Sequence, residues 1–269
     1  MLRWDGLHFL PPASLEPVAL HHGYLRLVGE GLSLELRFGA EKRPFDAYRD
    51  GMRLQRSAGL VATGLQSCRS ATAAALPGAL YGEDRLYAYR LAEGAVAALL
   101  YSRTPAFEEV VSLVGTMQWT PPERWRQWTY LDLAFVSPPK MLLREARFVP
   151  GSLSITLHRG DSVVTLSRHA PADILLAGAG LAAFGGTLMA GLDAGELRTL
   201  GDDLVAFHRP CSPWRILSPI FPWLGRGLRG RIRHDRQTNK ILLIIERGRL
   251  LPEDDYQRIV ESYVASEQG

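Results

Sequence analysis

The chain has 269 residues, 46% of them hydrophobic and 22% charged, which are values typical of a globular protein large enough for a sizeable core. The formal net charge of +3 is small for this length and argues against a dedicated nucleic-acid binder, although it leaves room for a local basic patch. Two cysteines, Cys68 and Cys211, are too few for a disulfide framework or a cysteine-based zinc site, so a cytoplasmic protein with free thiols is expected.

The opening segment "MLRWDGLHFLPP" predicts a short strand that stops at a proline. Leu7 and Phe9 alternate, so they share one face of a strand, and Pro11 and Pro12 then remove backbone donors. Because Asp5 and the prolines come before any long apolar run, the segment is not expected to be a secretory signal.

A β-hairpin and a helix are predicted next. In residues 23–38 leucines alternate on both sides of a Gly-Glu-Gly turn, which is typical of a hairpin. In residues 43–59 apolar positions are spaced among charges and a glycine ends the run, which indicates an amphipathic helix.

The first half closes with a second hairpin, over residues 85–102, and a helix. Thr104 is expected to cap this helix and Pro105 to occupy its first position, with acids in the first turn.

The second half repeats this order, which indicates an internal duplication. It begins with a strand that ends in prolines ("LAFVSPP"), and a hairpin over 151–168 and an apolar helix over 171–186 come next. A last hairpin and a helix that starts with Pro and two acids close it. A shift of 126 residues superimposes Trp4 on Tyr130, Leu7 on Leu133, Phe9 on Phe135, Leu10 on Val136 and Pro12 on Pro138.

The fold class predicted is therefore α+β, with two tandem repeats that each form an antiparallel sheet flanked by helices and that pack as a pseudo-twofold pair. The first module is expected over residues 1–117, a proline-containing linker over 118–127 and the second module over 128–269.

The apolar segment 174–192 is long enough to cross a bilayer, yet its five glycines, its alanines and the absence of basic anchors argue against a membrane span. We expect a buried helix over residues 172–186, covered on both sides, at the contact between the halves or in a homo-oligomer.

The order of elements resembles the PsbP/DcrB-like group, in which a module opens with a strand ending in proline and closes with a hairpin and a helix. "LHFLPP" and "LAFVSPP" match the opening, and "AFEEVVSLVGTM" and "YQRIVESYVAS" match the close, the second with Ser262-Tyr263. The resemblance implies binding or scaffolding, without one shared reaction.

No catalytic, cofactor or metal motif is predicted. A dinucleotide fingerprint, a nucleophile elbow, a Walker-type loop and the H-E-x-x-H pattern are all missing. His208 and Cys211 lie three residues apart and are kept as an alternative: a ligand-binding or enzymatic pocket between the modules.

The most suggestive feature is a basic stretch in the second half. Arg229, Arg231 and Arg233 alternate, so they are expected on one face of a strand, with Trp214 and Trp223 before them. The sequence therefore predicts a non-enzymatic adaptor that binds an acidic protein or ligand through these five residues. A protein partner is favoured over nucleic acid. Reversing the charge of the three arginines is expected to abolish partner capture without lowering the melting temperature.

Overall fold

The computed structural model describes residues 1–91, 93–190, 197–210 and 226–265. It divides into two compact units, Met1–Arg126 and Gln127–Gly269. The division falls inside the predicted linker 118–127, which contains a short strand and the start of the next one.

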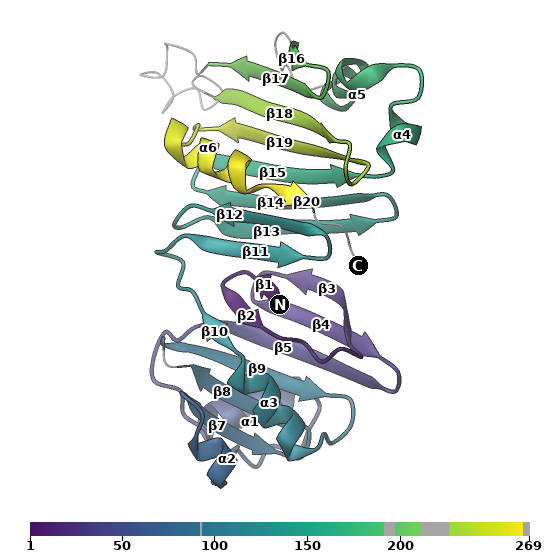
Figure 1. Ribbon diagram of the computed structural model, residues 1–269. Coiled ribbons are helices and arrows are strands. Elements are labelled where there is room, and N and C mark those ends of the chain that lie inside the picture. Colours follow the sequence, from purple (N-terminus) through teal and green to yellow (C-terminus); the bar gives the residue numbers. More distant parts are fainter. Residues whose placement is uncertain (92, 191–196, 211–225, 266–269) are drawn as a thin grey trace. The chain divides into compact units, whose positions relative to one another are not determined.

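The first unit contains a seven-stranded antiparallel sheet and a smaller group of three strands (Figure 1). The seven strands lie in the order β3-β4-β5-β9-β8-β7-β6 and the small group in the order β10-β2-β1. The strands are β1 (Leu2–Trp4), β2 (Leu7–Phe9), β3 (Glu16–His21), β4 (Tyr24–Gly29), β5 (Leu32–Ala40), β6 (Gln66–Ser67), β7 (Ala79–Glu83), β8 (Leu86–Leu91), β9 (Ala95–Tyr101) and β10 (Gln118–Trp119), and the helices are α1 (Arg49–Ser57), α2 (Ala71–Ala74) and α3 (Phe107–Gly115).

The second unit contains a sheet of the same connectivity, β13-β14-β15-β19-β18-β17-β16, and a small group β11-β12-β20. Its strands are β11 (Arg126–Tyr130), β12 (Leu133–Ser137), β13 (Leu142–Val149), β14 (Ser152–Arg159), β15 (Ser162–His169), β16 (Leu197–Gly201), β17 (Leu204–Arg209), β18 (Gly227–Asp235), β19 (Lys240–Gly248) and β20 (Val264–Ala265), and its helices are α4 (Ala172–Leu175), α5 (Gly180–Met189) and α6 (Glu253–Ser262). The α+β class with antiparallel sheets is thus as predicted, whereas the pseudo-twofold packing stays a prediction.

Period-two alternation builds the core of each sheet. Leu25 and Leu27 of β4 and Leu34 and Leu36 of β5 are fully buried on one face, as the hairpin pattern predicts. In the second unit the corresponding hairpin buries Leu153, Ile155 and Leu157 with Val164 and Leu166. Each fully buried aliphatic side chain of this kind contributes about 1.5–3 kcal/mol of transfer free energy.

Two helix predictions need correction. The helix expected over 171–186 consists of α4 and α5, because Gly178 between them and Gly180 at the start of α5 adopt positive φ angles of 80° and 72°. It is not covered on both sides within the described chain: Leu181 packs on the sheet, whereas Ile174 is 69% exposed. No described helix has both the length and the apolar character that a membrane span needs.

The helix that follows the hairpin over 85–102 begins later than predicted. α3 starts at Phe107 and Ala106 occupies the N-cap position without a capping side chain. Thr104 instead donates its hydroxyl to Asp84 Oδ1 at 2.5 Å, so it ties two loops together rather than capping the helix.

Candidate anion-binding site

The three arginines of β18 lie beneath helix α6 rather than on an open surface. Arg229 is 8% exposed, and its guanidinium lies 4.0 Å from the ring centroid of Tyr256 in α6. Arg233 donates from Nη2 to the carbonyl oxygen of Tyr263 at 2.9 Å. Arg231 is half-buried and lines, with Arg233, a pocket of about 130 Å³ below α6.

Each of the three guanidinium nitrogens of Arg229 has a partner inside the unit. Its Nε lies 2.5 Å from Oε2 of Glu246, its Nη1 lies 2.5 Å from Oε2 of Glu253, and its Nη2 donates to the Leu251 carbonyl at 2.8 Å. Glu246 is fully buried, and its other carboxylate oxygen accepts from the Leu251 backbone N–H. Burial raises the pKa of Glu246 above its ordinary value, against the opposing effects of this backbone hydrogen bond and of Arg229.

Arg229 is therefore the counter-ion of a buried carboxylate. The sequence alone predicts that reversing the charge of the three arginines leaves the melting temperature unchanged, and for Arg229 this expectation changes. Reversing its charge would place two negative groups together in the interior, so the melting temperature should fall. Trp214 and Trp223 lie outside the described residues, and so does Cys211. His208 is exposed on β17, opposite Arg229 in the strand register.

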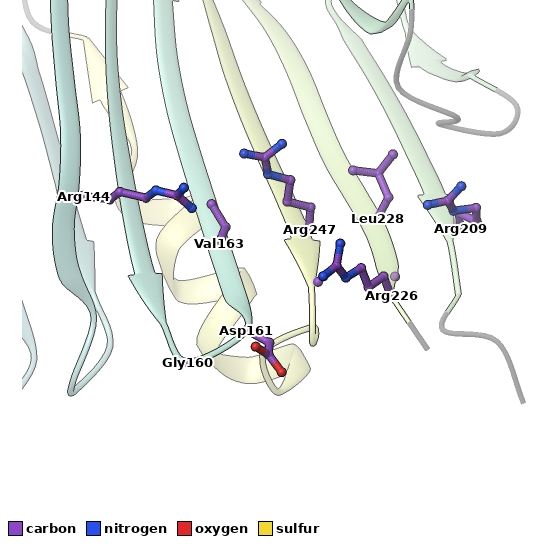
Figure 2. A pocket seen from close by; sticks show the side chains of 10 residues that line it. Arg144, Gly160, Asp161, Val163, Arg209, Arg226, Leu228 and Arg247 are labelled. Carbon is purple, nitrogen blue, oxygen red and sulfur yellow. The ribbon is translucent and has the colours of Figure 1, made fainter. Parts of the chain in front are cut away.

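A different set of arginines gathers on the opposite face of the same sheet. Arg144, Arg209, Arg226 and Arg247 line a groove of about 520 Å³, with Asp161 as the acidic residue of the lining (Figure 2). We call these four arginines and their surroundings the arginine groove.

The strand register explains how residues so far apart in sequence meet. Arg247 follows Glu246 directly, so its side chain points to the other face of β19, where Val163 of β15 lies opposite. Arg209 pairs in register with Leu228, a residue of the core cluster beside α5. Arg144 lies at an irregularity of β13 between Leu143 and Glu145, and Figure 2 shows its side chain directed toward Val163.

Gly248 is the last residue of β19 and lines the arginine groove. Gly248 adopts φ +93°, and a Cβ there would lie 1.9 Å from the carbonyl oxygen of Asp161. Since only glycine accommodates both conditions, β19 can end tightly against the β14–β15 turn and hold Arg247 beside the groove.

The groove has a surplus of cationic donors. Among the described residues, Arg144, Arg226 and Arg247 form no ion pair or hydrogen bond, and all three are exposed. A guanidinium presents a planar fork of donors that matches carboxylate and phosphate oxygens. The arrangement can therefore bind an anion. Nowhere in the described ranges do three His, Cys, Asp or Glu side chains gather as metal ligands would.

Sequence reasoning did not select Arg144, Arg209, Arg226 or Arg247 as site residues. The four residues come from widely separated segments, and their proximity depends on a strand order that no local pattern records.

The comparisons with known proteins concern the fold. Models of protein families gave no match to the sequence, and curated proteins gave none either. Among solved structures, a point mutant of the protein Mog1 matches with 10% identity over 53% of this chain and 97% of its own, with a TM-score of 0.34. The Saccharomyces cerevisiae Ran-binding protein Mog1p matches with 11% identity over 50% of this chain and 90% of its own, with a TM-score of 0.32.

A Pseudomonas aeruginosa MucA/MucB complex matches more weakly, with 11% identity over 98% of this chain and 93% of its own, and a TM-score of 0.18. At these identities the similarity to Mog1 concerns the fold over about half of this chain, and with TM-scores below 0.5 no family or role follows from it.

Proposed function

We propose that the chain is a non-enzymatic binding protein made of two duplicated α+β modules, and that its second unit binds an acidic segment of a partner protein in the arginine groove. The observation that carries the proposal is the set of three exposed arginines, Arg144, Arg226 and Arg247, without a partner among the described residues. The identical strand order of the two sheets supports the duplication.

The spread of the charges favours a chain of anions over a single one. Arg144 and Arg209 belong to β13 and β17, which are five strand positions apart in the sheet. At about 4.8 Å per position the row of arginines spans about 24 Å, which corresponds to about seven residues of an extended peptide. A lone phosphate would engage only part of this row.

Nucleic acid fits the groove less well than an acidic peptide does. Proteins that bind single strands stack bases on aromatic side chains. The described residues that line the groove include none. A protein partner therefore remains the proposal, as the sequence predicted, although the residues that carry it have changed.

The experiment measures binding of a fluorescently labelled oligoglutamate peptide to the full chain by anisotropy, at low and moderate salt. Arg144→Gln/Arg247→Gln should weaken binding about 10- to 30-fold, since each exposed charge pair contributes up to about 1 kcal/mol. Arg198→Gln, on an exposed position of β16 outside the groove, is the matched control and should leave the affinity unchanged.

Equal affinity of the double variant and the wild type would contradict the proposal. Inorganic tripolyphosphate that binds more tightly than the peptide, and loses affinity in the same double variant, would replace the protein partner with a phosphate ligand.

Three further expectations from the sequence stay predictions. They are a pocket between the modules that uses His208 and Cys211, a homo-oligomer formed through residues 172–186, and a cytoplasmic location.

A further inference from the structure

A second groove, of about 640 Å³, lies in the first unit, where the β4–β5 turn meets the end of β9 and the start of α3. We call it the acidic groove. The segment that follows β2, from Leu10 to Ser14, forms its remaining wall, and Leu10 is held there by a hydrogen bond from its backbone N–H to Oγ1 of Thr116 at 3.1 Å.

The floor and one wall of the acidic groove are apolar. Tyr101 and Leu113 are buried at its base, and Pro11 and Pro12 follow Leu10, whose side chain is 50% exposed. Burial raises the pKa of the Tyr101 hydroxyl above its ordinary value, and the charge of Glu109 adds to the shift. Exposed apolar surface beside a concave site is typical of contact with another molecule.

The rim of the groove carries a surplus of negative charge. Glu30 comes from the β4–β5 turn, whereas Glu108 and Glu109 come from the first turn of α3. Among the described residues that line the groove, the basic one is Arg103. None of the three carboxylates forms an ion pair or hydrogen bond with a described residue. The helix N-terminus explains the acids of α3, but it does not explain Glu30, which lies on a different element.

The corresponding place in the second unit has the opposite charge. There the β14–β15 turn and the loop between β19 and α6 enclose a groove of about 640 Å³. Its charged lining residues are Arg249 and Arg159, and Arg159 also forms an ion pair with Asp255 of α6 at 3.7 Å. The two sheets have the same connectivity, so the two grooves lie beside corresponding turns, and glutamates line the first whereas arginines line the second. A purely structural role would not require this divergence in charge.

We propose that the acidic groove of the first unit binds a segment of a partner protein in which Lys or Arg residues flank an apolar anchor. The anchor lies on Leu10, Tyr101 and Leu113, and the basic side chains pair with Glu30, Glu108 and Glu109. This goes beyond the anion site of the second unit: the two modules present grooves of opposite charge preference, as an adaptor that joins two different partners requires.

The test uses the full chain and a short fluorescent peptide with lysines on both sides of a Leu-Phe core, measured by anisotropy at low salt. The wild type should bind this peptide and should not bind a matched peptide with glutamates in place of the lysines. Glu108→Gln/Glu109→Gln should weaken binding about 10-fold, and Ser112→Arg, which adds a cation at an exposed lining position, should abolish it.

Glu93→Gln is the matched control, because Glu93 is an exposed acid at the β8–β9 turn, which is at the opposite end of the same sheet. Circular dichroism shows whether each variant is folded. Arg144→Gln/Arg247→Gln should bind the lysine peptide like the wild type, so the outcome does not depend on the arginine groove.

Two results would overturn the proposal. One is equal affinity of the wild type and the Glu108→Gln/Glu109→Gln variant for the lysine peptide, or no binding by either. The other is concentration-dependent self-association, seen by sedimentation, that Ser112→Arg abolishes, because the occupant would then be a second copy of this chain.

Discussion

The buried pair of Arg229 and Glu246 gives the sharpest test of the second unit. Arg229→Met keeps most of the side-chain volume over Tyr256 but removes the cation that lies 2.5 Å from a fully buried carboxylate. Removing one member of a buried ion pair typically costs about 3–5 kcal/mol, because the other charge stays in the interior without compensation. At about 3 °C per kcal/mol for a unit of this size, the melting temperature should fall by roughly 10–15 °C.

The pH dependence of this loss identifies its cause. Burial already raises the pKa of Glu246, so a proton on this carboxyl favours the folded state. Without Arg229 the pKa of Glu246 should rise further, and the deficit of Arg229→Met should shrink as the pH falls from about 8 toward the ordinary pKa of Glu, about 4.3.

The assay is denaturant unfolding and calorimetry of the wild type, Arg229→Met, Arg229→Met/Glu246→Gln and the control Arg231→Met. The double variant should regain part of the lost stability, since a neutral amide replaces the uncompensated charge, and the control should lose less than about 1 kcal/mol. A loss below about 1 kcal/mol in Arg229→Met, or a double variant less stable than the single one at pH 8, would refute the reasoning.

Two further predictions concern backbone geometry and a histidine. Gly248→Ala should destabilise the second unit by about 3 kcal/mol or more, because its Cβ would overlap the Asp161 carbonyl. Gly31 also has a positive φ but faces open space, so Gly31→Ala should cost about 1 kcal/mol. Equal losses of stability in the two variants would contradict this reasoning. Asp5 accepts a hydrogen bond from His22 (Nδ1–Oδ2 2.7 Å) and so raises the pKa of His22. The stability of the wild type relative to His22→Ala should therefore be complete below about pH 6.5 and should be lost as the pH rises through the raised pKa. A stability difference that does not change with pH would exclude this role.

The sequence determined the local elements and much of their order. Alternating apolar residues placed the hairpins at β4–β5 and β14–β15, because a period of two is a property of the strand itself. The same periodicity identified the strands that open the two copies, through Leu7 and Phe9 in the first half of the chain and Leu133 and Phe135 in the second. Helix ends were predicted less accurately. Thr104 is of a residue type that caps helices, but its hydroxyl donates to Asp84 in another loop.

Only the tertiary structure decided what each strand face meets. Alternation places Arg229, Arg231 and Arg233 on one face of β18, but it does not say that α6, which begins at Glu253, covers that face and supplies partners to Arg229. It equally does not say that Arg247 and Arg144 line one groove on the opposite face, because that arrangement arises from the order of strands in the sheet. A strand's period is set by its own backbone, whereas its environment is set by segments that pack on it from elsewhere in the chain, and the binding sites proposed here belong to the second kind.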